Sequence, residues 1–297
     1  MPRSPQRTEP FRIAVCRGRR WHVSSGVRVA AVVLSLFTLL VPFAASRRAH
    51  AQTKQEMGKQ LLGQALRALG GDAFLRVRTV HQEGRAYAFY RENLRGLAVM
   101  NLYQQFEPMP ESHEAGWLPI SRREVYTEDG DYYSLYQNGK GWEVTFQGAR
   151  PLPEDRQARY RDSARRDIFF LLRYRLDEEG MYFYHKGLEI VDNTPTDAVE
   201  VFDAEGLGVT YNFRRSDRLP VQQSYQQRDP QTGIPEDVRE IFSRYKTTDG
   251  VTLPWNLRVE RDGEKVFEFF GRSTEIDGKV PPGAFGLNGI TILPPKP

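Results

Sequence analysis

Residues 54–90 read KQEMGKQLLGQALRALGGDAFLRVRTVHQEGRAYAFY, and within this stretch the chain changes from a helical pattern to a strand pattern. The first half spaces apolar side chains at steps of three and four, which places them on one face of a helix. These residues are Met57, Leu61, Leu62, Ala65, Leu66 and Leu69. Gly70 and Gly71 end the predicted helix, because glycine adopts the left-handed C-cap conformation without a Cβ clash. A β-type run begins at Thr79, so we expect one amphipathic helix followed by a sheet.

Most of the remaining chain alternates between strand-like runs and tight-turn signals. Asn-Gly and Asp-Gly pairs supply the positive φ angles that short hairpins require, and they occur at Asp129-Gly130, Asn138-Gly139, Asp249-Gly250 and Asp262-Gly263. Trp142, Val144 and Phe146 alternate with polar residues, which is typical of a sheet with one buried face. The pattern predicts an α+β fold in which a strongly curved antiparallel sheet wraps its apolar face around the helix.

One segment, at about residues 151–176, interrupts the strand pattern. Residues 155–172 are rich in helix-forming side chains, polar at the start and strongly apolar at the end, where the chain reads IFFLL. We predict a helical insert here that serves as a lid or plug.

The first 51 residues have the features of a secretory signal peptide. An arginine-rich start is followed by an apolar run at residues 29–43 and by Ala49-His50-Ala51, a small-x-small cleavage signal. We expect cleavage between Ala51 and Gln52; the alternative is a retained anchor formed by residues 27–45. The predicted organisation is therefore a signal peptide at 1–51, a sheet domain at 52–287 and a proline-rich tail at 288–297. Near the end of the sheet domain, Phe285 and Leu287 are expected to pack against the rim of the sheet.

Removing the signal peptide reverses the sign of the net charge. The chain has 42 basic and 38 acidic residues, of which residues 1–51 contain nine and one, so 33 basic and 37 acidic residues remain. Nucleic-acid binding then lacks the concentrated basic surface that it requires. The one cysteine, Cys16, lies in the predicted signal peptide, so the remaining chain has no disulfide and no thiol nucleophile.

No residue pattern points to catalysis, a metal or a cofactor. His81, His113 and His185 lack metal-ligand spacing, and the chain has no Gly-x-Ser-x-Gly elbow. The adjacent carboxylates Glu154-Asp155, Glu178-Glu179 and Glu236-Asp237 fall at turns and helix starts, where solvated acids are common. An enzyme such as a hydrolase is therefore the least favoured class of function, and we predict no cofactor, no metal and no catalytic residue.

Aromatic residues are concentrated in the middle of the chain, which has 14 Tyr, 17 Phe and 4 Trp in all. An ordinary β core explains them, since aromatic side chains favour strands. A concave apolar cavity between the sheet and the helices explains them equally well. For that case we predict that Trp142, Val144 and Phe146 line the cavity together with Met100 and Leu102, and that Phe169 and Phe170 cover it.

The layout also resembles a known family. A signal peptide, an amphipathic helix ending in Gly-Gly, a long antiparallel meander with a helical insert, and the late run YKTTDGVTLP at residues 245–254 are similar to the periplasmic outer-membrane lipoprotein-sorting family, which includes LolA, LolB and LppX. The resemblance covers most of residues 52–285. It implies an incomplete β-barrel closed by a helical lid, with acyl chains held in its cavity.

From this resemblance we expect a periplasmic, non-catalytic carrier or chaperone whose partner is a lipid acyl chain or a lipoprotein. The alternative is a cell-envelope interaction module that recruits an envelope protein partner through open sheet edges, because an unpaired edge strand can accept a further strand.

Overall fold

The computed structural model describes residues 53–112, 114–127, 130–229 and 232–295. The predicted signal peptide, its cleavage site, His113 and Asp129 lie outside these residues, so export and cleavage stay predictions.

The first described helix, α2, spans Lys54–Ala68 and begins with a complete capping box. The Thr53 side chain accepts a hydrogen bond from the backbone N–H of Glu56, and the Glu56 side chain accepts one from the backbone N–H of Thr53. The helix ends as predicted at the glycine pair, where Gly70 and Gly71 have φ angles of 123° and 55°. A Cβ at Gly70 would lie 2.5 Å from the carbonyl oxygen of Gly250, so only glycine lets the end of the helix approach the distant turn at Gly250 so closely. The short helix α3 (Asp72–Arg76) follows.

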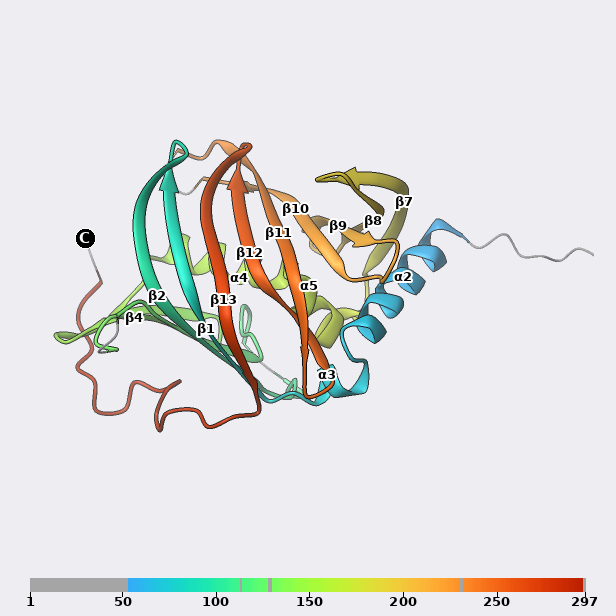
Figure 1. Cartoon of the computed structure of the whole chain (residues 1–297). Coiled ribbons are helices and arrows are strands. Elements are labelled where there is room, and N and C mark those ends of the chain that lie inside the picture. The colour runs from blue at the N-terminus through green and yellow to red at the C-terminus, as the bar shows by residue number, and fades with distance from the viewer. Residues whose placement is uncertain (1–52, 113, 128–129, 230–231, 296–297) are drawn as a thin grey trace, which may run out of the picture. The chain divides into compact units, whose positions relative to one another are not determined.

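A single antiparallel sheet of thirteen strands forms most of the molecule (Figure 1). The strands are β1 (Thr79–Tyr90), β2 (Asn93–Phe106), β3 (Ile120–Val125), β4 (Tyr133–Gln137), β5 (Lys140–Thr145), β6 (Gly148–Pro151), β7 (Tyr182–Val191), β8 (Thr194–Phe202), β9 (Gly208–Arg214), β10 (Pro220–Arg228), β11 (Pro235–Thr248), β12 (Val251–Arg261) and β13 (Glu264–Ile276). Their order is β6-β5-β4-β3-β2-β1-β13-β12-β11-β10-β9-β8-β7. The first and last strands of the chain pair with each other in the middle of the sheet, and β6 and β7 form two separate edges. The sheet is therefore an open half-barrel, as the sequence predicted.

The predicted insert is helical but divided. Helix α4 (Glu154–Arg166) is followed by the short α5 (Ile168–Phe170) and a π-helical turn, η1 (Leu171–Arg175). The break falls at Asp167, whose side chain accepts a hydrogen bond from the N–H of Phe170 and so caps the second part. Figure 1 shows the long strands β1, β2, β11, β12 and β13 curving over α4 and α5.

The main core joins both helical segments to the sheet. The most deeply buried helical residues belong to one apolar cluster with inward-facing residues of β7–β12. They are all at most 2% exposed: Leu62 and Ala65 of α2, its C-cap Leu69, and Ile168, Leu171 and Leu172 of the insert. Helix α2 packs mainly on β7, where Gly58 approaches the backbone of Phe183. The curved sheet thus encloses two helical elements, with α2 at its β7 end and the insert across the middle.

The C-terminal segment covers the other end of the sheet. Ala284 and Phe285 are buried against Val125, Tyr133, Leu135 and Val144, and Leu287 packs beside them. Backbone hydrogen bonds between Ala149 and residues Thr291 and Leu293 form a short parallel bridge onto β6. Phe285 and Leu287 therefore pack against the sheet, but they lie on its outer face and not at the predicted rim. Strand β6, which this segment covers, was absent from the sequence prediction.

Candidate ligand-binding cavity

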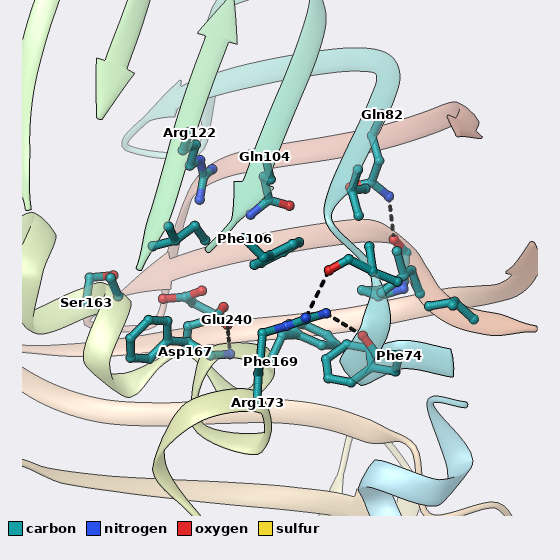
Figure 2. Close-up of a pocket in the computed structure, with 18 of the residues that line it drawn as sticks. Phe74, Gln82, Gln104, Phe106, Arg122, Ser163, Asp167, Phe169, Arg173 and Glu240 are labelled. Carbon is teal, nitrogen blue, oxygen red and sulfur yellow. Dashed lines mark hydrogen bonds between the residues drawn. The ribbon is translucent and has the colours of Figure 1, made fainter. Parts of the chain in front are cut away.

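A cavity of about 160 Å³ lies between the insert and the concave face of the sheet (Figure 2). Its apolar wall comes from α3, the start of β1, the end of β2, the starts of β3 and β12, and the second half of the insert. The apolar lining residues are Phe74, Val77, Val80, Phe106, Ile120, Phe169, Phe170, Val251, Leu253 and Pro254. Phe169 is held by an edge-to-face contact with Phe242, with ring centroids 5.4 Å apart. The wall is therefore a packed surface that surrounds a space which its own side chains do not fill.

Arg173 fixes one side of the cavity. Its guanidinium donates hydrogen bonds to the backbone carbonyls of Phe74, Leu75 and Val77, the last two at 2.7 and 3.0 Å. It also lies over the ring of Phe106, 4.3 Å from the centroid. One side chain from η1 thus ties the insert to the connection between α3 and β1, and Figure 2 shows it between Phe169 and Phe74.

The opposite end of the cavity is polar. Arg122 from β3, Asp167 from the insert and Glu240 from β11 reach it, together with Tyr160 and Ser163 of α4. Arg122 pairs with Glu124 at 2.5 Å, and the Tyr225 hydroxyl donates to Glu240 at 2.9 Å. Burial raises the pKa of the Asp167 carboxyl. Burial, with the nearby Asp167 charge, also raises the pKa of Glu240. Two carboxyl groups therefore share a site that disfavours their charged forms.

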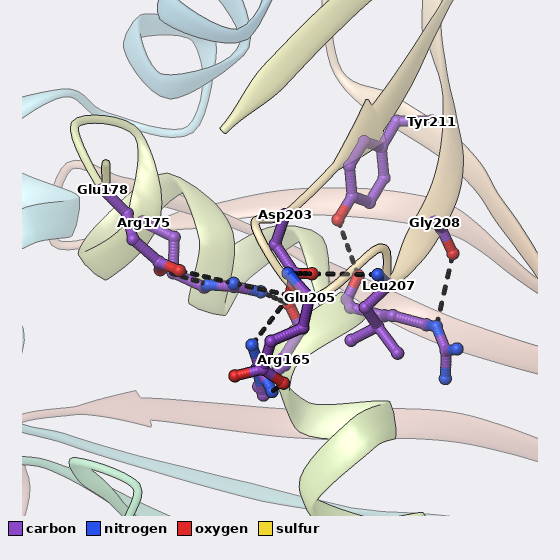
Figure 3. A network of polar contacts seen from close by, with 9 residues as sticks. Arg165, Arg175, Glu178, Asp203, Glu205, Leu207, Gly208 and Tyr211 are labelled. Atoms are coloured by element: carbon purple, nitrogen blue, oxygen red, sulfur yellow. Dashed lines mark hydrogen bonds and ion pairs between the residues drawn. The ribbon is translucent and has the colours of Figure 1, made fainter. Parts of the chain in front are cut away.

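A buried ion network anchors the insert to the β8–β9 turn (Figure 3). Asp203, whose side chain is 1% exposed, accepts from Arg165 at 2.8 Å and from Arg175 at 2.9 Å. Arg175 also forms a two-pronged pair with Glu178 at 2.6 and 2.8 Å. Burial alone would raise the pKa of Asp203, but the hydrogen bonds from Arg175 and from the N–H of Leu207 hold it below its usual range. The network fixes the cavity's helical cover on the β8 side.

The structure brings only part of the predicted site together. Phe169 and Phe170 line the cavity, whereas Trp142 and Val144 belong to the cluster under the C-terminal segment. Met100 and Leu102 are buried in a third cluster with Ala86 and Phe269.

Phe146 departs from the predicted position most clearly, since it is 85% exposed. The chain turns at Phe146 and Gln147 into β6, so the alternation that buries Val144 ends at Thr145.

Sequence reasoning missed the polar residues of the cavity. One signal for Glu240 was present, because it occupies the inward-facing position between the buried Val238 and Phe242 of β11. Arg122 and Asp167 have no comparable pattern, since one lies in a short polar strand and the other is an ordinary helix cap.

Neither His81 nor His185 lines the cavity. His81 stacks on Tyr103 with centroids 4.2 Å apart and forms a hydrogen bond of 2.9 Å with Asn101. His185 lies in β7, and its buried Nε2 has no hydrogen-bond partner among the described residues. Within the described ranges, no cluster of three or more His, Cys, Asp or Glu side chains is arranged to hold a metal ion. Within the same ranges, no helix has the length and apolar character needed to span a membrane.

Comparisons with known proteins show the fold. No family model and no curated protein sequence matches this chain. Among solved structures, it is similar to an outer membrane lipoprotein-sorting protein domain from Vibrio parahaemolyticus, with 10% identity, 79% of this chain and 98% of that chain covered, and a TM-score of 0.53. It is also similar to a DUF1329 family protein from Desulfovibrio piger, with 14% identity, 81% and 100% covered, and a TM-score of 0.53. A LolA superfamily protein from Nitrosomonas europaea matches at 10% identity over 78% and 98%, with a TM-score of 0.45. The predicted resemblance to the lipoprotein-sorting fold is confirmed.

Proposed function

We propose that this protein is an exported, non-catalytic carrier that binds the acyl chain of a lipid or lipoprotein in the cavity beneath α5. The observation that carries the proposal is an apolar-walled cavity enclosed between the insert and the curved sheet. Ligand sites in proteins are commonly concave and mainly apolar, with a few polar groups at defined positions. The shared fold with a lipoprotein-sorting domain supports the same function.

The size of the cavity limits what it accepts in the conformation described. At about 160 Å³ it is close to the cavity of roughly 150 Å³ that binds one benzene molecule. It therefore accommodates the end of an acyl chain, about six carbons by that comparison. A complete long chain requires either displacement of the insert or an extension of the ligand beyond the cavity.

The polar groups support binding over catalysis. Asp167 caps α5 and Glu240 accepts a hydrogen bond from Tyr225, so both carboxylates have structural roles. A catalytic function would also require a nucleophile or an activated water between these two carboxylates. Among the described residues, no serine, threonine or cysteine nucleophile is hydrogen-bonded to a carboxylate or imidazole base at the polar end of the cavity.

The test is to measure ligand binding after filling the cavity. The full-length sequence is expressed, the protein is recovered from the cell envelope, and co-purified lipid is identified by native mass spectrometry followed by organic extraction. Ala164 lines the cavity, and Ala158 lies on the same helix at an open surface groove. We expect Ala164→Leu to weaken binding of a fluorescent fatty acid by about tenfold or more, a loss of 1.4 kcal/mol or greater.

Ala158→Leu serves as the matched control and should stay within about twofold of the unmodified protein. Equal binding by both variants, or an unmodified protein that carries no lipid and binds no acyl probe, would overturn the proposal.

The second candidate function is an interaction module. Strand β7 is the sheet edge that no described segment bridges, and its Leu188 and Ile190 are 60% and 72% exposed. Such an edge can pair with a strand from an envelope protein. If this is the function, Ile190→Lys should abolish capture of one defined partner and leave acyl-probe binding unchanged.

A further inference from the structure

A second hollow lies on the other side of α4. This groove has a volume of about 840 Å³ and runs between α4 and the inner faces of β4 and β5, with Tyr126, directly after β3, beside them. Its lining residues are Tyr126, Tyr132, Ser134, Tyr136, Glu143, Leu152, Arg156, Arg159, Tyr160, Ser163, Asp229 and Arg261. It differs from the inner cavity in character, because four tyrosines and three arginines replace the apolar wall.

The acidic side chains of the groove already have partners. Glu143 accepts a hydrogen bond from the Tyr132 hydroxyl at 3.2 Å. Asp229 accepts hydrogen bonds from Thr232 and lies 3.9 Å from Arg159, which also pairs with Glu236 at 3.2 Å. The groove therefore presents no carboxylate that lacks a donor.

Several donors of the groove have no such partner. Arg156 and Arg261 form no ion pair and no side-chain hydrogen bond with any residue that the structure describes, and the buried Nε of Arg261 has no acceptor. The hydroxyl of Tyr160 is also buried without a hydrogen-bond partner among the same residues. Burial of a donor without an acceptor costs free energy. An excess of donors and positive charge over acceptors fits a ligand group rich in negatively charged oxygens.

The groove and the inner cavity share one wall. Tyr160 and Ser163 line both spaces, so a single layer of α4 side chains separates them. Tyr160 is stacked on Tyr136 with ring centroids 4.2 Å apart, which holds this wall in place. A ligand with its apolar end in the cavity would need to pass only this layer to place its other end in the groove.

We propose that the groove binds the anionic group, a phosphate or a carboxylate, of an amphiphile whose apolar chain occupies the inner cavity. This inference rests on the proposed function, since it names the chemistry of the ligand's polar end. Arg156 and Arg261 supply the positive charge, the Tyr160 hydroxyl supplies a neutral donor, and the tyrosine rings form rigid walls around the headgroup.

The test compares three probes on the purified full-length protein by isothermal titration calorimetry. Dodecyl phosphate carries both the chain and the anion, monolauroylglycerol carries a chain of the same length without charge, and inorganic phosphate carries the anion alone. We expect dodecyl phosphate to bind at least about tenfold more tightly than either of the others. Raising the salt concentration should reduce this preference, because salt screens exposed charges.

Two variants assign the effect to the groove. Arg156→Gln and Arg261→Gln should each remove most of the preference for dodecyl phosphate without changing the affinity for monolauroylglycerol. Arg156 is exposed on the first turn of α4, so its substitution leaves the fold intact. Arg67→Gln, an exposed arginine of α2, is the control and should change neither affinity.

The outcomes separate this inference from the proposed function. Equal affinities for the two lipid probes, or an unchanged preference in both variants, would overturn the headgroup site and leave the acyl-chain proposal standing. If inorganic phosphate bound as tightly as dodecyl phosphate, the groove would be a site for a free anion. The proposal that its ligand is an amphiphile would then be wrong. If neither dodecyl phosphate nor monolauroylglycerol bound, the proposed function itself would be wrong.

Discussion

The two arms of the sheet are covered by different kinds of segment. In the β3–β6 arm, the C-terminal segment packs Ala284 and Phe285 onto the outer face, opposite the face that lines the cavity, and the cluster around Leu135 is filled. In the arm containing β11 and β12, the helical insert covers the concave face and a cavity remains. An irregular segment can direct each side chain to a gap, whereas a helix presents side chains at a fixed spacing of 3.6 residues. The comparison indicates that an irregular cover fills the face beneath it, whereas the helical cover leaves a hollow.

The largest effect is expected where the insert is anchored. Asp203→Ala removes the acceptor shared by Arg165 and Arg175 and leaves buried donors with fewer partners. Breaking a buried ion pair in this way costs about 3–5 kcal/mol. Urea denaturation of the variant measures the loss. Asp177→Ala removes the exposed pair with Lys59 and should cost less than about 1 kcal/mol. If the two variants lost similar stability, the insert would not be anchored at Asp203.

A single substitution can open a cavity in the packed cluster around Phe285. Phe285 is 9% exposed, and Phe285→Ala should lower the free energy of unfolding by about 3 kcal/mol, because it opens a space in a packed cluster. The account also requires that acyl-probe affinity stay within about twofold, since this cluster lies apart from the cavity. A large loss of binding in the folded variant would show that the cluster around Phe285 takes part in the site.

The buried carboxyl groups predict a pH dependence. Burial raises the pKa values of Asp167 and Glu240 in the folded state, so their contribution to stability is fully present below the ordinary carboxyl pKa. It is lost as the pH rises through the raised values. Asp203, whose pKa is lowered, acts in the opposite sense and loses its contribution as the pH falls.

Melting temperatures of the unmodified protein and of an Asp167→Asn, Glu240→Gln double variant, measured from pH 4 to pH 8, check this prediction. The double variant should lose less stability with rising pH. Parallel curves for the two proteins would contradict the assignment.

The smallest effect concerns the wall between cavity and groove. Tyr160→Phe removes a buried hydroxyl that has no acceptor among the described residues and keeps the ring stacked on Tyr136. The expected change is between zero and a gain of about 1 kcal/mol, measured by urea denaturation. A decrease in the free energy of unfolding of more than about 1 kcal/mol would mean that the hydroxyl has a stabilising partner.

Local patterns in the sequence were sufficient for the fold and for one end of the cavity. The spacing from Met57 to Leu69, the Gly70-Gly71 stop and the Asx-Gly turns reflect short-range physics, so they predicted the helix and most strands correctly. The apolar run at Phe169 and Phe170 likewise indicated the face that lines the cavity.

The remainder depends on contacts between distant segments. Alternation buries Trp142 and Val144 but does not show which cover lies over them, and that cover comes from residues more than one hundred positions later. Arg122, Asp167 and Glu240 meet only through the curvature of the sheet, so no local pattern predicts their proximity.

The central claim is that the space beneath α5 is the ligand site, and acyl-probe titration of Ala164→Leu beside Ala158→Leu tests it most directly. The account predicts a loss of about tenfold or more for Ala164→Leu and unchanged affinity for Ala158→Leu, with both variants folded. Full affinity in Ala164→Leu would contradict it, because the ligand would then bind elsewhere on the protein.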